Sequence, residues 1–386
     1  MACLASLPIE LKGAICSAVA DLAPQGESLA AGGKDLASLR LVSLEWAALS
    51  SRFFWKTAKL DYRSADDLSS FLGLVVPRHA NHIHCATFGK ETPGGEASRR
   101  VDRALDIIRR LPQLRDVDLE LGISKKHKMD DSRLLEEIGR EGSQVVKLHL
   151  SGYEYAALDA LPVSRLLRRL PKLGTLNLRD IGKDKSGDLQ AAIRSLEHLK
   201  VLQFESCDAC SDSLLVDDWQ PPLYTLNIYH CNSLTLSSFR ALASTFLETL
   251  QNIYYVSSHT KLPSPFPPFD LPQLLDLRLE LYSSLFPLLR TFDKSPLRVL
   301  CLRIVLDPNE KAEVIFGALL LLVQAHRESL RAVRVTVMDS EGEEVDEAHS
   351  EELRKWCEAQ GVDVKLGFWD AWEDFGTAME VRSLHG

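Results

Sequence analysis

Residue types that bind metals or carry redox chemistry lie close together at two places in this chain of 386 residues. Residues 79–85 contain three histidines and a cysteine, and Cys207-x-x-Cys210 is followed by Cys231. A structural zinc site needs four nitrogen or sulfur ligands in a tetrahedral arrangement, so either group could supply most of one. A Cys-x-x-Cys pair also has the spacing of redox-active thiols. Which chemistry is open to them depends on the elements that position them.

A leucine repeat supplies most of these elements. Leucine makes up 66 of the 386 residues, about 17%, which favours helices or a leucine-rich repeat over an immunoglobulin-like sandwich. The pattern Leu-x-x-Leu-x-Leu recurs, for example at Leu173, Leu176 and Leu178, with a mean spacing of about 28 residues. The last apolar positions of the copies, weak ones included, are residues 60, 88, 119, 150, 178, 204, 228, 253, 279, 302, 335 and 366.

Each repeat of this length is expected to contain a short strand and a helix, and such repeats bury their apolar faces only by stacking. Residues 97–111, 187–196 and 236–246 support this, because their apolar residues recur at helical steps of three and four. Residues 262–272 contain five prolines and should be extended. We predict an α/β leucine-rich-repeat solenoid over residues 57–386, a horseshoe of about 11–12 irregular repeats with parallel strands inside and helices outside.

The repeat gives both groups of ligand-type residues a structural role. Cys207 and Cys231 each follow the last apolar residue of a strand by three positions, where leucine-rich repeats use Asn or Cys to bond the turn backbone. His82 and His84 would share one face of a strand, and Cys85 would point to the other. We therefore expect no metal and no cofactor. The chain also lacks the G-x-S-x-G, G-x-x-x-x-G-K-[ST] and H-E-x-x-H signatures, so we expect no catalytic residues and no enzyme activity.

Charge and hydropathy narrow the classes of partner. The formal net charge is −9, which argues against sequence-independent nucleic-acid binding because that needs a basic face. The longest apolar run, residues 314–323, is about half the length of a membrane span. Eight irregularly spaced cysteines, and an N-terminus without a basic leader, fit a cytoplasmic or nuclear protein with reduced thiols. We expect protein partners, and no nucleic acid, membrane or small-molecule substrate.

The segment before the first repeat reads as a small helical module. Leu7, Leu11 and Ile15 are spaced by four residues, and Pro8 lies where the first turn of a helix tolerates proline. Asp35 should cap the N-terminus of a second helix. That helix would carry an apolar stripe at Leu36, Leu39, Val42 and Trp46.

The same segment reads Leu7-Pro8-x-Glu10-Leu11, then Ile15, then Asp35-Leu36-x-x-Leu39-Arg40-Leu41-Val42-Ser43-x-x-Trp46, and ends at Trp55. This order of residues resembles an F-box. In F-box/leucine-rich-repeat proteins the F-box helices dock on a Skp-type adaptor, which links them to a cullin–RING ubiquitin ligase, and the repeats hold the target protein. The resemblance implies an all-α F-box module over residues 1–56, ahead of the solenoid. It implies adaptor binding by Leu7, Pro8, Leu11, Ile15, Leu36, Leu39, Val42 and Trp46.

The inner face of the predicted solenoid is the candidate target surface. In each strand the residues between the core positions point to this face, and they are mixed in charge. Tyr and Arg are the residue types that most often anchor interfaces, although exposed strand faces are polar by default. The candidate partner-binding residues are Asn177, Arg179, Asn227, Tyr229, Arg278, Tyr282, Arg303 and Arg334.

Two functions fit these observations. The first, which the resemblance implies, is the substrate-recognition subunit of a Skp–cullin–F-box ubiquitin ligase, with an unidentified target protein on the repeats. The second is a leucine-rich-repeat scaffold or inhibitor whose N-terminal helices only cap the solenoid. A cap is expected in either case, because the end of a repeat array needs a cover over its core.

Overall fold

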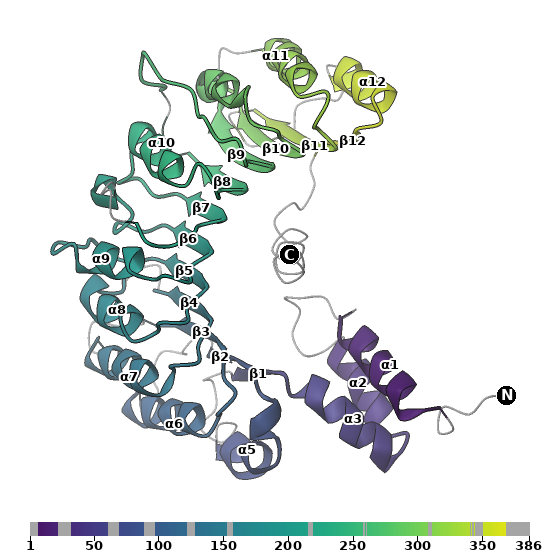
Figure 1. Ribbon diagram of the computed structural model, residues 1–386, viewed down its shortest axis with the longest axis vertical. Helices are drawn as coiled ribbons and strands as arrows, with labels where there is room; N and C mark the ends of the chain where they lie inside the picture. Colours follow the sequence, from purple (N-terminus) through teal and green to yellow (C-terminus); the bar gives the residue numbers. More distant parts are fainter. Residues whose placement is uncertain are drawn as a thin grey trace. The chain divides into compact units, whose positions relative to one another are not determined.

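The computed structural model contains one parallel sheet whose twelve strands, β1 to β12, follow each other in chain order (Figure 1). The chain divides into two compact units between Leu150 and Ser151, and each is described by itself. None of the described helices is long and apolar enough to cross a membrane. The described residues are 7–21, 32–60, 69–88, 97–121, 128–152, 157–214, 219–257, 259, 261–307, 311–339, 341, 343 and 350–367.

Three helices precede the first strand: α1 (Ile9–Asp21), α2 (Gly32–Arg40) and α3 (Leu44–Phe54). Two expectations for this segment are wrong. The second predicted helix is interrupted after Arg40, so Val42 lies in a turn and Trp46 lies on α3. Ser43 favours the interruption, because its hydroxyl accepts a hydrogen bond from the backbone N–H of Trp46 at 3.3 Å and caps α3. Asp35 lies in the first turn of α2 and not at its N-cap.

The rest of the first unit consists of four strands and the helices beside them. Consecutive strands pair in register, as in Ala58↔Ala86 and Ala86↔Val117, and all three side chains are buried. The strands are β1 (Thr57–Leu60), β2 (Cys85–Phe88), β3 (Asp116–Glu120) and β4 (Lys147–Ser151). The helices are η2 (Phe71–Val75), α5 (Val76–His79), η3 (Ala80–His82), α6 (Ala97–Arg109) and α7 (Lys128–Glu141).

The second unit repeats the alternation of strand and helix, and α8, α9 and α10 lie along one side of their strands (Figure 1). The strands are β5 (Thr175–Arg179), β6 (Val201–Glu205), β7 (Thr225–Tyr229), β8 (Asn252–Val256), β9 (Asp276–Tyr282), β10 (Val299–Val305), β11 (Ala332–Met338) and β12 (Asp363–Leu366). The helices are α8 (Ala160–Leu167), α9 (Asp188–Arg194), η5 (Asp212–Leu214), α10 (Leu236–Thr245), η6 (Ser283–Phe292), α11 (Ala312–Ala325) and α12 (Glu351–Ala359).

One register runs through the strands of the second unit without a shift. Facing positions on consecutive strands carry the core, and each of the five residues in this row is at most 1% exposed: Leu176, Leu202, Leu226, Ile253 and Leu277. Because the strand of every repeat buries the same positions, the stack shares one continuous core.

The α/β repeat predicted from the leucine pattern is confirmed. All twelve predicted strand positions lie in strands, and the helices predicted within 97–111, 187–196 and 236–246 are α6, α9 and α10. Residues 262–272, all of them described, form no helix, as their prolines indicated. Residues 1–6 of the predicted N-terminal module and 368–386 of the predicted solenoid lie outside the described part of the chain.

Two buried side chains, Phe269 and Leu271, place the proline-rich segment in contact with the core. Phe269 is 0% exposed, and its ring stacks on that of Phe292 with centroids 4.3 Å apart and an interplanar angle of 11°. Its ring also lies 5.7 Å from that of Phe239, and its backbone N–H donates to the carbonyl of Thr291 at 2.8 Å. This repeat therefore fills its core with a side chain from an extended segment.

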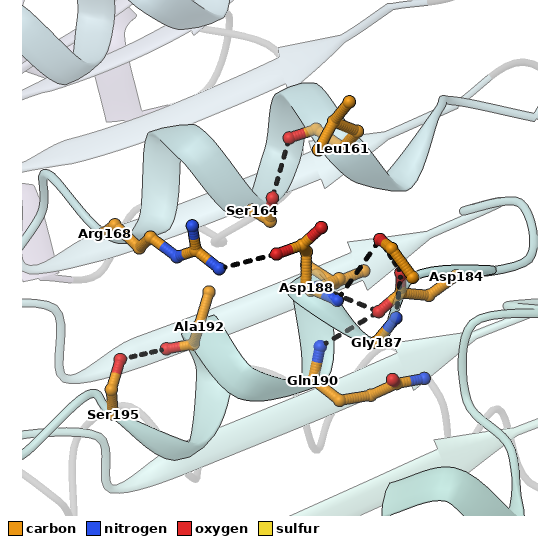
Figure 2. A network of polar contacts seen from close by, with 11 residues as sticks. Leu161, Ser164, Arg168, Asp184, Gly187, Asp188, Gln190, Ala192 and Ser195 are labelled. Atoms are coloured by element: carbon orange, nitrogen blue, oxygen red, sulfur yellow. Dashed lines mark hydrogen bonds and ion pairs between the residues drawn. The ribbon is translucent and has the colours of Figure 1, made fainter.

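A carboxylate at the start of α9 takes the place of a side-chain N-cap (Figure 2). One oxygen of Asp184 accepts the backbone N–H of Gly187 at 3.0 Å, and the other accepts those of Leu189 and Gln190 at 2.8 and 3.2 Å. Gly187 has φ +75°, a conformation that favours glycine. Asp184 thus satisfies three N–H groups that the first turn of a helix leaves without intrahelical partners.

Asp184→Ala is expected to lower the free energy of unfolding by about 1–2 kcal/mol, because three backbone donors lose a charged acceptor. Urea unfolding followed by circular dichroism measures the change. Arg168→Ala is the control, since its bond to Asp188 at 2.9 Å joins two exposed groups (Figure 2) and solvent-exposed ion pairs contribute little to stability. Equal losses in the two variants would contradict the capping role.

Candidate protein-interaction surfaces

The helical module has a small core of its own. Cys16, Leu36 and Trp46 pack together and are at most 4% exposed. Two residues predicted to bind an adaptor, Leu36 and Trp46, are therefore inside the module, where they hold the helices together. The side chains packed partly against this core are Leu7, Ile15, Val19, Ala20, Leu39, Leu49, Phe53 and Phe54.

Large apolar side chains remain outside although this core is filled. They lie on the first residues of α1, in the turn between α2 and α3, and on the first residue of α3. We call the five residues the exposed apolar cluster; their exposed fractions are 53% for Ile9, 52% for Leu11, 88% for Leu41, 45% for Val42 and 91% for Leu44. Pro8, beside them in the sequence, is exposed as well. Groups of exposed apolar residues mark interaction surfaces in soluble proteins.

An ion pair holds the starts of α1 and α3 together. The buried ammonium of Lys12 bonds to the carboxylate of Glu45, and these residues directly follow Leu11 and Leu44 of the exposed apolar cluster. A buried ammonium depends strongly on its acidic partner, so the pair fixes the two helix starts side by side. The sequence does not reveal this contact, because the residues are 33 positions apart and a helical lysine is ordinarily solvated.

The end of the helical module contacts the first repeats of the same unit. The ring of Trp55 stacks on that of His79 with centroids 5.1 Å apart and an angle of 20°. The carbonyl of Lys56 accepts the backbone N–H groups of His84 and Cys85 at 2.9 and 3.0 Å. Burial, and after it the charge of Arg40, lowers the pKa of His79, so the stacked imidazole is neutral near pH 7.

The predicted target residues of the second unit all lie at strand positions between the core residues. The register aligns them in rows across the strands. One row contains Asn177, Gln203, Asn227, Tyr254, Arg278, Cys301 and Arg334. The next contains Arg179, Glu205, Tyr229, Val256, Glu280, Arg303 and Thr336, and Tyr282 follows on β9.

Several of these side chains are bound within the protein. Arg278 bonds to both carboxylate oxygens of Asp276 at 3.0 and 2.7 Å, and its side chain is 12% exposed. Arg334, also 12% exposed, bonds to Asp363. Asn227 donates to the Gln203 side chain at 3.2 Å and is 7% exposed. Such side chains can shape the surface but present little area to a partner.

Three of the predicted residues keep more of their surface. The exposed fractions are 44% for Arg179, 33% for Arg303 and 36% for Tyr282. Arg179 and Arg303 approach Glu205 and Glu280 at 3.4 and 3.5 Å, so each cation is partly balanced by a neighbouring strand. Asn177 and Tyr229 are half-buried, so they also belong to the accessible part of the predicted target surface.

Two tyrosines lie between these arginines. The rings of Tyr229 and Tyr254 meet edge to face, with centroids 4.4 Å apart and an angle of 82°. Burial raises the pKa of both phenols, so they stay protonated over the physiological range. Tyr254 is buried and Tyr229 is half-buried, so the pair mainly packs β7 against β8.

The ligand-type residues have structural contacts. The one proton of the Cys207 thiol is shared between the carbonyls of Leu178 and Glu205, at 3.1 and 3.2 Å. Both carbonyls belong to strands, so Cys207 bonds to the strand backbone and not to the turn. His82 ends η3, so the expectation that it shares a strand face with His84 is wrong. Within the described ranges, no group of His, Cys, Asp and Glu side chains could hold a metal ion.

Comparison with known proteins adds little to this description. No protein-family model matches the chain, and no curated protein matches it. Among solved structures, a chain in the crystal structure of the Rad7 and Elc1 complex in yeast matches with a TM-score of 0.36 and 13% sequence identity. The match covers 87% of this chain and 90% of that one. A similarity at this level carries no argument about function.

Proposed function

We propose that this chain is the substrate-recognition subunit of a Skp–cullin–F-box type ubiquitin ligase. The helical module docks on a Skp-type adaptor, and the strand face of the repeats binds a target protein. Ubiquitin transfer is carried out by other subunits, so this chain is not itself an enzyme, and it acts in the cytoplasm or nucleus. The observation that carries the proposal is the exposed apolar cluster on a module whose own core is already filled.

Physical chemistry supports a partner on this cluster. Fully burying one Leu or Ile side chain contributes about 1.5–3 kcal/mol, so five exposed apolar residues represent a large gain that the free chain does not realise. The Lys12–Glu45 pair joins the starts of α1 and α3, so the residues that the cluster takes from these two helices are held in place before a partner binds. A pre-formed apolar surface suits a helical partner with a complementary groove.

The strand face supports a protein target. Arg179, Arg303 and Tyr282 are accessible, and Arg and Tyr are enriched among residues that dominate binding energy. The row contains two cation–carboxylate pairs, Arg179 with Glu205 and Arg303 with Glu280, so the face has no single sign of charge. A target with its own mixed pattern of charges fits this face better than a uniformly charged polymer does.

A specific contact favours the second candidate, a repeat scaffold with a helical cap. The stacking of Trp55 on His79, and the bonds from His84 and Cys85 to the Lys56 carbonyl, are what a cap on the first strands requires. The two functions differ in the role of the helical module. A receptor uses it to bind an adaptor, whereas a scaffold needs it only to cover the first strands.

Removing residues 1–56 tests one candidate against the other. The receptor function predicts that residues 57–386 stay soluble, unfold cooperatively, and lose binding to a recombinant Skp-type adaptor that the full chain binds. Size-exclusion chromatography, thermal unfolding and a pull-down give these three readouts. Aggregation of the shortened chain, together with no adaptor binding by the full chain, would favour the scaffold.

A further inference from the structure

The solvent side of α11 is apolar. The large side chains of Val314 and Leu321 are 67% and 59% exposed. The other residues on this side are small: Gly317 and Ala325 are exposed, and Ala318 is half-buried. A Cβ atom placed on Gly317 would meet no other atom within 4 Å, so the surface is open at this point.

The opposite side of α11 is already packed into the repeat core. Its buried residues are Ala312, Ile315, Phe316, Leu319, Leu322 and Val323. A helix that is apolar on all sides is ordinarily covered on all sides. The neighbouring helix α12 follows the usual rule for outer helices (Figure 1), because its exposed residues include Glu351, Glu352, Lys355 and Glu358. The apolar outer side of α11 is therefore not a consequence of its place in the repeat.

This side of α11 is complementary to itself in size. In an isologous interface the same surface occurs on both subunits, and a two-fold axis perpendicular to a helix lays the two copies of that helix antiparallel. With the axis midway between Ala318 and Leu321, Leu321 of one copy faces Ala318 of the other, and Val314 faces Ala325. Each large side chain therefore meets a small one.

The ends of α11 are complementary in charge under the same axis. Lys311 directly precedes the helix, Glu328 lies in the turn after it, and both are exposed. Lys311 of one copy faces Glu328 of the other, and symmetry repeats the pair at the opposite end. A parallel pairing would instead bring like charges together, so the charges favour the antiparallel orientation.

We propose that α11 is a self-association surface, through which two copies of this chain pair with their α11 helices antiparallel. Complementarity in both size and charge favours a second copy, because an unrelated partner requires neither. Two helices of 14 residues bury less area than a stable dimer usually needs, so we expect a weak dimer, with a Kd on the order of 10–100 μM. The inference is independent of adaptor and target binding.

Sedimentation equilibrium of the full chain, at concentrations below and above the expected Kd, tests the surface. The average mass should rise about twofold, from that of one chain to that of two. The Val314→Asp/Leu321→Asp variant should stay monomeric, whereas Leu161→Asp, a matched change at a 44% exposed leucine of α8, should associate as the wild type does. A wild-type chain that stays monomeric, or undiminished association of the double variant, overturns the proposal.

An exchange of charges tests the antiparallel register. Lys311→Glu and Glu328→Lys should each weaken association about tenfold, because like charges then meet at both ends of the helix pair. The two changes together should restore the wild-type Kd. Both are compatible with the helix, since a carboxylate is favourable at its start and an ammonium at its end. A folded double variant that associates no better than the single ones rules out this pairing.

Discussion

Replacing Leu41 and Leu44 by Asp is expected to abolish detectable binding of this chain to a Skp-type adaptor. Both side chains are about nine-tenths exposed, at 88% and 91%, so the free chain gains nothing from them. If both are buried at the interface, their loss removes about 3–6 kcal/mol, more than a hundredfold in affinity, before the cost of burying two carboxylates is added. Isothermal titration calorimetry with the purified adaptor measures the effect.

The fold should tolerate this double change. Leu44 is the first residue of α3, where a carboxylate is favourable at the helix N-terminus, and Leu41 lies in a turn. Val314→Asp/Leu321→Asp on α11 is the matched control, because these side chains are 67% and 59% exposed in the other unit. The control should bind the adaptor as the wild type does. Unchanged affinity in the Leu41→Asp/Leu44→Asp variant would show that the exposed apolar cluster is not the docking surface.

Phe269→Ala is expected to lower the free energy of unfolding of the second unit by about 3–5 kcal/mol. The side chain is fully buried, and its ring is stacked at 4.3 Å on Phe292 and lies 5.7 Å from Phe239. Residues 262–272 form no helix. Phe269 therefore has no helical neighbours in its own segment whose side chains could fill the cavity. Urea unfolding monitored by fluorescence and circular dichroism measures the loss.

Phe266→Ala is the matched control for this prediction. It removes the same ring from the same segment, but Phe266 is only half-buried and touches Phe269 at a centroid distance of 6.1 Å. Removing the Phe266 ring should lower the free energy of unfolding by clearly less, because water can fill most of the space that a half-buried ring leaves. Equal destabilisation by the two changes would mean that Phe269 does not carry the packing of this repeat.

The repeat architecture was predictable because one rule acts on every strand. Positions such as Leu226 and Ile253 face each other in register and are buried by the neighbouring repeats, so the leucine pattern and the stack have a common cause. The proline-rich segment was predictable for a local reason, since proline excludes a helix wherever it lies. Both predictions required only interactions between residues that are close in sequence or that lie in adjacent repeats.

The candidate surfaces were less predictable because they depend on contacts between distant residues. The apolar stripe through Leu36, Val42 and Trp46 suggested one long helix, but the Ser43 cap competes with it locally and moves Trp46 into the core of the module. The same interruption exposes Leu41 and Leu44, which the stripe did not include. On the strand face, the burial of Arg278 depends on its bond to Asp276 and on the packing around it, which strand alternation does not reveal.

Titration of the purified full chain with a recombinant Skp-type adaptor is the decisive test of adaptor docking. We expect saturable binding with a micromolar or lower Kd, lost in the Leu41→Asp/Leu44→Asp variant and kept in the Val314→Asp/Leu321→Asp control. Absence of binding heat and of co-elution, with a chain that circular dichroism shows to be folded, would contradict the receptor function.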